Sequence, residues 1–399
     1  MSEKKFKRIV VLVADGFGVG AAPDANLYGD EGSNTLAHVA KNVGGIRLPN
    51  LQKMGLGNLG TIEGLPSTIN PKAIVARLAE KSKGKDTTTG HWELAGLVTE
   101  TPFQLFPNGF SQDLLNDFIT EAKITGVLGN KAASGTEIIK ELGEEHLSTG
   151  KVIVYTSGDS VFQIAAHEKV FGLERLYQIC EVARRLTIPY QIGRVIARPF
   201  VGENSQNFKR TEHRKDFSIS PPPNCLDVLQ EHDVKVLSVG KIDDIFAHRG
   251  ISAGNHTGNN RDSLEATLDF MKKYRNEQAF IFTNLVDFDQ LYGHRRDPKG
   301  YAGSLVELDL FLPKLLTELT EDDCLILTSD HGCDPTFRGS DHTREFVPLV
   351  AYSPRFEGQT LGDRNSFSDV AASVLEAYQI KNHSMVLQGQ SFLCKPKRS

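Results

Sequence analysis

The segment 329–343, SDHGCDPTFRGSDHT, contains two Asp-His pairs. Asp330 and His331 follow the apolar run CLILTS, and His342 comes eleven residues after His331. Only a folded loop could bring the two imidazoles together across that separation. Carboxylates and imidazoles are common ligands of divalent transition-metal ions, so this segment suggests a metal site.

Similar residues follow two other apolar runs. Asp15 ends the run RIVVLVADG, and the segment VDFDQLYGHRRD contributes an acid and a histidine. The whole candidate set has three carboxylates and three imidazoles: Asp15, Asp289, His294, Asp330, His331 and His342. Such a set suits two divalent cations, and Mn²⁺ or Zn²⁺ fits it better than Ca²⁺, which prefers oxygen ligands alone.

Each of these residues also has a simpler explanation. Asp and Gly often end a strand as turn residues, and most of the twelve histidines in the chain need no catalytic role. The recurrence of an acid at three strand ends, each beside a histidine or a glycine turn, favours the metal site. Residue spacing alone does not assign individual ligands to individual ions.

The segment 84–93, GKDTTTGHWE, offers three hydroxyl groups between two glycines. A threonine hydroxyl is a weak nucleophile near neutral pH, but coordination to a divalent cation lowers its pKa. A polar loop or a helix cap is the alternative explanation of this segment.

The elements that must position these groups are short apolar runs alternating with helical segments. The runs expected to form buried strands are 8–16, 151–160, 234–241, 279–289, 324–332 and 347–354, and the segments with helical spacing are 173–186, 262–274, 304–319 and 368–380. This alternation predicts an α/β fold with a mostly parallel sheet flanked by helices. Ligands of such sheets bind beyond the carboxyl ends of the strands, where the three acids are expected.

The region 98–220 has looser periodicity and ends near the proline-rich segment SISPPPN. It predicts a smaller inserted domain, which divides the core into residues 1–97 and 221–399.

The formal net charge of −5 gives no large basic field for nucleic acid. Five scattered cysteines without a C-x-x-C pair, and an apolar run near the N-terminus too short for a membrane span or signal, predict a cytoplasmic, soluble protein.

Four segments between residues 13 and 354 resemble the bacterial phosphopentomutase family of the alkaline phosphatase superfamily: VADGFGVGAAPDA, GKDTTTGHWE, NLVDFDQLYGHRRDP and SDHGCDPTFRGSDHTREFVPLVAYSP. The second and third segments are highly specific, whereas a bare DHG is shared with many relatives. The resemblance implies an alkaline phosphatase-like core with an inserted α/β cap domain. It also implies that Asp15, Asp330 and His331 bind one Mn²⁺ ion, and that Asp289, His294 and His342 bind a second.

The resemblance implies a reaction as well. The family interconverts α-D-ribose 1-phosphate and D-ribose 5-phosphate, or the 2-deoxy sugars, through a phosphothreonine that matches Thr87, although Thr88 and Thr89 offer neighbouring hydroxyls. Glucose 1,6-bisphosphate or a similar sugar bisphosphate is the activator suggested by the family. Candidate substrate-binding residues are Ser157, Asp159, Arg194, Arg198, Arg210 and Lys241. The expected partners are therefore small sugar phosphates, with no nucleic acid or membrane.

Two other functions remain open from the sequence. The first is a metal-dependent phosphatase or a phosphoglycerate mutase-like enzyme of the same superfamily. The sulfatase motif C-x-P-x-R is absent, and the phosphoglycerate enzymes use serine where this chain has Thr87. The second is a non-catalytic phosphosugar-binding protein, which would be expected to lack a ligand or the nucleophile, whereas this chain retains them all.

Overall fold

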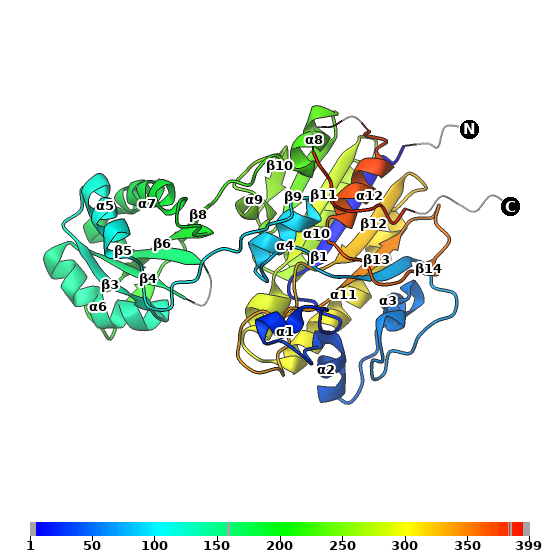
Figure 1. Cartoon of the computed structure of the whole chain (residues 1–399), viewed down its shortest axis with the longest axis horizontal. Coiled ribbons are helices and arrows are strands. Elements are labelled where there is room, and N and C mark those ends of the chain that lie inside the picture. Colours follow the sequence, from blue (N-terminus) through cyan, green and yellow to red (C-terminus); the bar gives the residue numbers. More distant parts are fainter. Residues whose placement is uncertain (1–4, 158–159, 382, 384, 394–399) are drawn as a thin grey trace. The chain divides into compact units, whose positions relative to one another are not determined.

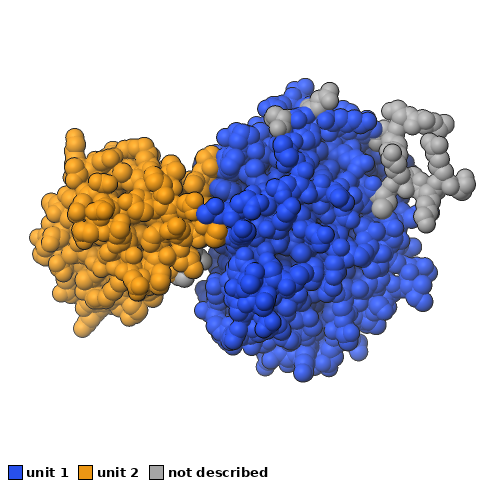
Figure 2. Space-filling view, in the orientation of Figure 1, with its two compact units in different colours: residues 1–101, 221–399 blue, residues 102–220 orange. Residues whose placement is uncertain are grey.

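The computed structural model describes residues 5–157, 160–381, 383 and 385–393 (Figure 1). The chain divides into two compact units (Figure 2), of which unit 1 comprises residues 1–101 and 221–399 and unit 2 comprises residues 102–220. The insertion predicted from the sequence begins at residue 98, whereas unit 2 begins at Pro102.

Unit 1 is built around an eight-stranded sheet with the strand order β10-β9-β11-β1-β12-β13-β2-β14. Its strands are β1 (Arg8–Ala14), β2 (Ile74–Leu78), β9 (Lys235–Val239), β10 (Ala253–Asn255), β11 (Ala279–Leu285), β12 (Asp323–Thr328), β13 (Val347–Tyr352) and β14 (Gln359–Thr360). The strands from β10 to β12 pair in parallel, whereas β13 is antiparallel to both of its neighbours. The chain passes from β12 to β13 through a loop without a crossover helix, which an antiparallel pair permits.

Two groups of helices cover the sheet of unit 1. The first group packs together around α11 and contains α2 (Thr35–Asn42), α3 (Pro49–Met54), α10 (Asn260–Lys273) and α11 (Pro298–Glu318). The second contains α4 (Thr87–Leu94), α8 (Cys225–Glu231), α9 (Ile242–Ile245) and α12 (Asp369–Ala377). The remaining short elements are α1 (Ala25–Tyr28), η1 (Leu56–Leu59) and the π-helical turn η3 (Phe288–Gly293). Strand β1 is buried along its whole length, as expected for a strand covered on both faces.

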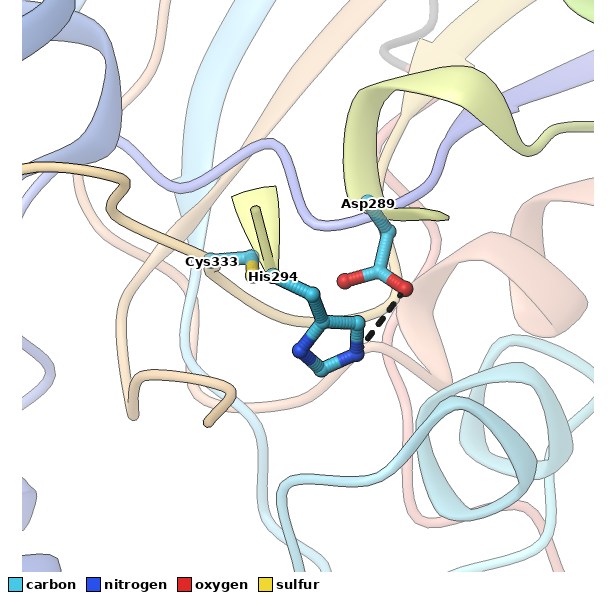
Figure 3. Close-up of side chains that lie close together, drawn as sticks. All are labelled: Asp289, His294 and Cys333. Carbon is cyan, nitrogen blue, oxygen red and sulfur yellow. Dashed lines mark ion pairs between the residues drawn. The ribbon is translucent and has the colours of Figure 1, made fainter. Parts of the chain in front are cut away.

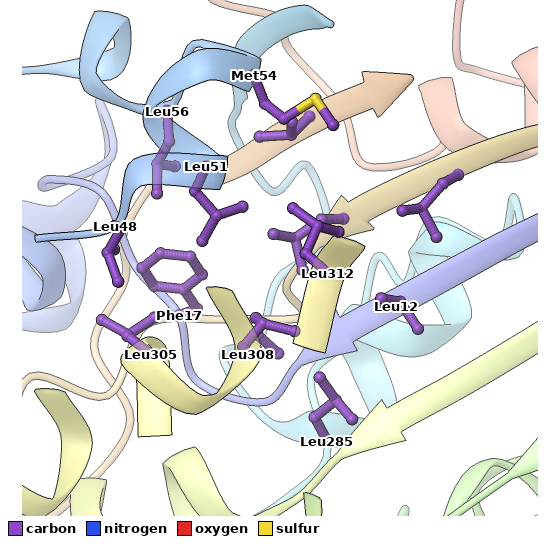
Figure 4. Close-up of a cluster of buried hydrophobic side chains, with 14 of the residues drawn as sticks. Leu12, Phe17, Leu48, Leu51, Met54, Leu56, Leu285, Leu305, Leu308 and Leu312 are labelled. Carbon is purple, nitrogen blue, oxygen red and sulfur yellow. The ribbon is translucent and has the colours of Figure 1, made fainter. Parts of the chain in front are cut away.

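The main hydrophobic core of unit 1 lies between α11, α3 and the central strands (Figure 4). Leu305, Leu308 and Leu312 of α11 belong to one buried cluster with Leu12 of β1 and Leu285 of β11. Their spacing places them on one face of the helix. This packing fixes the adjacent strands β1 and β11, whose ends carry candidate ligands.

Unit 2 has its own sheet, with the order β3-β4-β5-β6-β7 and with β8 paired to β6. Its elements are α5 (Gln112–Ala122), β3 (Val127–Ala132), α6 (Gly135–Thr149), β4 (Val152–Thr156), β5 (Val161–His167), η2 (Glu168–Gly172), α7 (Leu173–Thr187), β6 (Arg194–Val201), β7 (Lys209–Arg210) and β8 (Lys215–Ser218). A separate core that includes Phe118, Phe162 and Ile179 packs α5 and α7 against this sheet.

The predicted α/β class with a mostly parallel sheet is confirmed, and every predicted strand run and helical segment contains the expected element. One prediction needs correction: the run 324–332 stops being a strand at Thr328, so Asp330 and His331 lie in the following loop. Strands β2, β5 and β6 are among those that were not predicted from the sequence.

In the described part of the chain, no helix is long and apolar enough to cross a membrane. Cys180, Cys225, Cys324 and Cys333 are buried free thiols. Burial raises the pKa of Cys225 to about 12, so this thiol stays protonated near neutral pH.

Candidate active site

Three acids meet at the carboxyl edge of the unit 1 sheet. Asp15 directly follows β1, Asp330 lies two residues beyond the end of β12, and Asp289 lies in η3 shortly after β11. These three strands are parallel neighbours in the order β11-β1-β12, so their carboxyl ends lie side by side. All three carboxylates are buried. The other acid after β11, Asp287, is used differently, since its Oδ2 accepts the Asn260 backbone N–H at the start of α10.

Asp15, Asp330 and His331 form the first group of possible ligands. The His331 Nε2 atom lies 3.4 Å from Asp15 Oδ1 and 3.3 Å from Asp330 Oδ2. The Nδ1 atom of the same ring lies 3.1 Å from the Gly332 carbonyl oxygen, which favours a proton on Nδ1 and a lone pair on Nε2. The Gly16 backbone N–H fixes the other oxygen of Asp330 at 3.1 Å.

Asp289, His294 and His342 form the second group (Figure 3 shows the first two with Cys333). The Asp289 carboxylate lies 3.2 Å from His294 Nε2 and 3.5 Å from His342 Nε2. The two Nε2 atoms are 3.1 Å apart, and both Nδ1 atoms lie beside backbone carbonyl oxygens, those of Ser340 and Lys85. Both rings therefore turn the same nitrogen toward the acid.

The two groups of ligands are in contact. The rings of His331 and His342 stack with their centroids 3.7 Å apart, and Asp289, His331 and His342 have ligand atoms within 4.8 Å of one another. The structure thus brings all six predicted ligand residues into one cluster. Cys333, which the sequence analysis did not consider as a ligand, lies beside Asp289 and His294.

The pKa values in the cluster reflect its crowded negative charge. Burial, together with the nearby carboxylates of Asp330 and Asp289, raises the pKa of Asp15 to about 7. Burial also acts to raise the pKa of Asp330, but the neighbouring charges of His331 and His91 outweigh it and hold this pKa below its usual range. Burial lowers the pKa of His331 to about 4, which leaves its imidazole neutral at pH 7.

The residues fit a metal centre on structural grounds. Asp15 Oδ1, Asp289 Oδ1 and Asp330 Oδ2 are buried and accept no hydrogen bond among the described residues. A buried carboxylate oxygen without a partner is costly unless a proton or a cation compensates its charge. Each of these oxygens faces an imidazole nitrogen at 3.3–3.5 Å, so both members of a pair can bind the same ion.

Thr87 lies beside this cluster, at the first position of α4. Its Oγ1 atom is 3.2 Å from His331 Nε2. Asp86 caps the helix by accepting the Thr89 backbone N–H at 3.0 Å. Helix α4 packs closely against the loop after β12, because a Cβ atom on Gly90 would lie 2.0 Å from the Asp330 carbonyl oxygen. Glycine at this position therefore allows the threonine to approach the ligands.

The three neighbouring threonines have different surroundings. Thr87 is half-buried, whereas Thr88 and Thr89 are buried. The Thr89 hydroxyl already donates to Asp86 Oδ2 at 2.6 Å. Of the three, Thr87 has the hydroxyl that faces a candidate metal ligand.

The predicted substrate-binding residues separate into two places. Lys241 lies in unit 1 at the start of α9. Burial raises the pKa values of Asp15 and Asp287, and the positive charge of Lys241 opposes this rise. The three arginines lie in unit 2. Ser157 directly follows β4, and Asp159 lies outside the described residues.

The arginines of unit 2 gather around Tyr155. Burial raises the pKa of this phenol, and the positive charges of Arg198, Arg210 and Arg214 oppose the rise. Arg194 is paired with Asp216 at 3.7 Å, as is Arg214 at 2.7 Å.

Arg198 and Arg210 differ from the other two arginines. The first donates through Nε to the neutral Gln163 at 3.0 Å, and the Nε atom of the second is buried with no acceptor. Neither forms an ion pair with an acid among the described residues. These two guanidinium groups are therefore the ones best able to accept an external anion.

Sequence reasoning missed two buried polar residues beside the ligands. His91 lies 3.1 Å from Asp330 through its Nδ1 atom, and Asn284 donates to Asp15 Oδ2 at 3.0 Å. A signal for each was present. His91 follows Thr87 by four residues and so shares its helix face, and Asn284 is an amide in the mostly apolar run FIFTNLV.

Comparison with known proteins places these residues in a family. Residues 7–382 match the family described as the Metalloenzyme superfamily. A phosphopentomutase from Acetivibrio thermocellus is 51% identical over 390 residues, which cover 97% of this chain and 99% of that protein. One from Carboxydothermus hydrogenoformans is 53% identical over 378 residues, which cover 94% and 96%.

Among solved structures, the PH0037 protein from Pyrococcus horikoshii superposes with a TM-score of 0.50 at 10% identity, covering 96% of this chain and 100% of its own. That likeness concerns the fold alone. With the family match, it confirms the predicted alkaline phosphatase-like fold class. On the strength of the near-full-length relatives, this chain belongs to the phosphopentomutase family within the metalloenzyme superfamily.

Proposed function

We propose that this chain is an isomerase that interconverts α-D-ribose 1-phosphate and D-ribose 5-phosphate, or the corresponding 2-deoxy sugars. The names of its near-full-length relatives support the reaction. The main structural support for this function is the position of Thr87, whose Oγ1 atom lies 3.2 Å from His331 Nε2 at the edge of the ligand cluster.

The proposed cofactors are two Mn²⁺ ions. Asp15, Asp330 and His331 would hold one of them. The second would be held by Asp289, His294 and His342. Mixed oxygen and nitrogen ligands and the three carboxylate oxygens without donors support this assignment. When bound, the ions would neutralise charge on the transferred phosphoryl group and lower the pKa of the accepting hydroxyl.

The chain's own part in the reaction centres on Thr87 as phosphoryl carrier. Phospho-Thr87 transfers its phosphoryl group to O1 of ribose 5-phosphate, so the Oγ–P bond breaks, an O1–P bond forms and O1 loses its proton. The resulting bisphosphate returns its 5-phosphoryl group to Thr87, and O5 takes up a proton. The N-terminus of α4, where Thr87 is the first residue, favours the negative charge of the phosphoryl group.

The non-reacting phosphate requires an anchor of its own. Arg198 and Arg210 are the best supported of the predicted residues, because they lack acidic partners among the described residues. Arg194 and Lys241 remain in the proposed set, as do Ser157 and Asp159 as sugar contacts. The proposed inserted cap, residues 98–220, contains all of these except Lys241.

The activator and the cellular compartment are also proposed. Glucose 1,6-bisphosphate or a similar sugar bisphosphate would first phosphorylate Thr87 and leave as the monophosphate. The protein would act in the cytoplasm, which the free thiols of its described cysteines support.

The decisive experiment maps the phosphoryl group. The Mn²⁺-loaded protein is treated with glucose 1,6-bisphosphate, and its tryptic peptides are analysed by mass spectrometry. We expect one added phosphoryl group on Thr87, in the peptide that begins at Asp86. Thr87→Ala should abolish both the modification and mutase activity, whereas Thr87→Ser should retain part of each because a primary hydroxyl can do the same chemistry.

Matched variants of the neighbouring threonines complete the test. Thr88→Ala and Thr89→Ala should remain phosphorylatable. Phosphate on either neighbour, or full mutase activity in Thr87→Ala, would show that Thr87 is not the carrier. Release of inorganic phosphate from ribose 5-phosphate without formation of ribose 1-phosphate would instead identify a phosphatase.

A further inference from the structure

His91 is a buried imidazole that the proposed metal assignment does not use. It lies on α4 one turn after Thr87, and its side chain is fully buried. Its Nδ1 atom lies 2.8 Å from the Thr87 carbonyl oxygen and 3.1 Å from Asp330 Oδ2. Both of these atoms are acceptors, so Nδ1 carries a proton, which it donates to the Thr87 carbonyl oxygen and which lies close to the Asp330 carboxylate.

The other nitrogen of the same ring faces Asn284 on β11. The Asn284 amide nitrogen lies 3.4 Å from His91 Nε2 and 3.0 Å from Asp15 Oδ2. The reverse orientation of the amide would place its oxygen against the carboxylate of Asp15, so the two contacts together define the orientation shown. One NH₂ group has two hydrogens and can serve both acceptors.

These contacts form one buried chain of hydrogen bonds. It runs from the Thr87 carbonyl through His91 and Asn284 to Asp15, and the Nδ1 proton of His91 also faces Asp330. The participants come from α4, from β11 and from the loops after β1 and β12.

We propose that His91 and Asn284 are a positioning pair that holds the first turn of α4 at a fixed distance from the carboxylates of Asp15 and Asp330. This inference rests on the proposed role of Thr87. Neither side chain touches the transferred group. The pair acts through residues that do, by keeping the nucleophile and the metal ligands in one geometry, as hydrogen-bond partners of metal ligands commonly do.

The test compares His91→Leu, Asn284→Leu and the double variant with the wild-type protein. Two quantities are measured on each: the dissociation constant for Mn²⁺ by calorimetry on metal-free protein, and kcat and KM for ribose 5-phosphate. Each single variant should lose about 10-fold to 100-fold in kcat or in Mn²⁺ affinity, with KM nearly unchanged. Because the two residues act through one chain, the double variant should lose little more than either single variant.

Two additional variants separate positioning from general stability. His91→Asn can place an amide N–H near the position of Nδ1, and should recover part of what His91→Leu loses. His232→Leu is the matched control, because His232 makes the same contact with the carbonyl oxygen four residues earlier, at 2.9 Å. This control should keep wild-type kcat and Mn²⁺ affinity. Thermal melting establishes that every variant is folded.

The outcomes distinguish this inference from the proposed function. Wild-type kcat and Mn²⁺ affinity in His91→Leu, fully additive losses in the double variant, or a folded His91→Asn no better than His91→Leu would each overturn the positioning pair. A wild-type protein without mutase activity would overturn the proposed function, while the Mn²⁺ affinities would still test whether the pair positions Asp15 and Asp330.

Discussion

The two units of the molecule gather opposite charges. In unit 1, three buried carboxylates have oxygens that accept no hydrogen bond in the described chain. In unit 2, positive guanidinium groups surround Tyr155, and two of them have no acidic partner among the described residues. Under the proposed function, cations in unit 1 stabilise the phosphoryl group in transfer, and guanidinium groups of unit 2 bind the phosphate that does not react. The two units thus differ in the sign of the charge that their candidate residues carry.

The largest effect is expected from Asp330→Asn in unit 1. Asp330 lies beside His331 and His91 and accepts the Gly16 N–H, so its charge is needed at the centre of the cluster. We expect a loss of more than about 100-fold in mutase activity, together with loss of bound metal. Metal analysis by mass spectrometry and a coupled mutase assay measure the two losses. Full metal content with undiminished turnover would show that Asp330 is not a metal ligand, and would contradict the assignment of the metal chemistry to unit 1.

A smaller effect is expected from His294→Ala at the more open side of the same cluster. The His294 side chain is 35% exposed, against 1% or less for Asp330 and His331, so water can take its place as a ligand. Activity should fall by about 10-fold to 100-fold and should recover in part when Mn²⁺ is added in excess. The control is His248→Ala, whose ring is 74% exposed and pairs with Asp243, and which should behave as wild type. A loss that added Mn²⁺ does not reduce would contradict this prediction.

Unit 2 should show a different kinetic signature. Arg210→Ala removes a guanidinium group proposed to bind the non-reacting phosphate, so KM for ribose 5-phosphate should rise about tenfold while metal content stays constant. Steady-state kinetics and metal analysis measure both. Arg185→Ala is the control, since Arg185 is 65% exposed and pairs with Glu121 at 3.6 Å. An unchanged KM in Arg210→Ala would place this residue outside the site.

The smallest effect concerns the stability of unit 2 at acidic pH. His146 accepts the His167 N–H through Nε2 at 2.8 Å, and burial lowers its pKa. In the unfolded chain this histidine has a pKa near 6.5, so below that pH it binds a proton more readily than it does in the folded protein. The stability that the neutral, folded His146 provides is therefore present above about pH 6.5. It is lost as the pH falls, by an amount on the order of 1 kcal/mol near pH 5.5.

Hydrogen exchange of peptides from α6 and β5, corrected for the intrinsic exchange rate, measures this change locally. The wild-type protein should lose protection between pH 7.5 and pH 5.5. His146→Leu should be less protected at pH 7.5 but should change less between the two values. An equal change in both proteins would show that another group controls the stability of unit 2.

Several features could be predicted from the sequence because they depend on neighbours along the chain. Apolar runs predicted β1, β11 and β12, and an acid after each run predicted a carboxylate at the carboxyl edge of the sheet. The α/β class and the family were also predicted correctly. The positions of His91 and Asn284 could not be assigned, because a buried polar residue reveals its partner only when distant segments pack together.

Residue types and local order thus determined the ligand candidates, the capped threonine segment and the alternation of strands and helices. The tertiary structure alone decided that β11, β1 and β12 are neighbours, although β1 lies more than 250 residues before the other two. It also decided that Thr87, rather than Thr89, faces His331, and that Arg194 pairs with Asp216, whereas Arg198 and Arg210 form no ion pair with an acid in the part of the chain that the structure describes. The physical reason is range: backbone propensity and capping act within a few residues, whereas the position of a side chain relative to distant groups is fixed by the packing of whole elements.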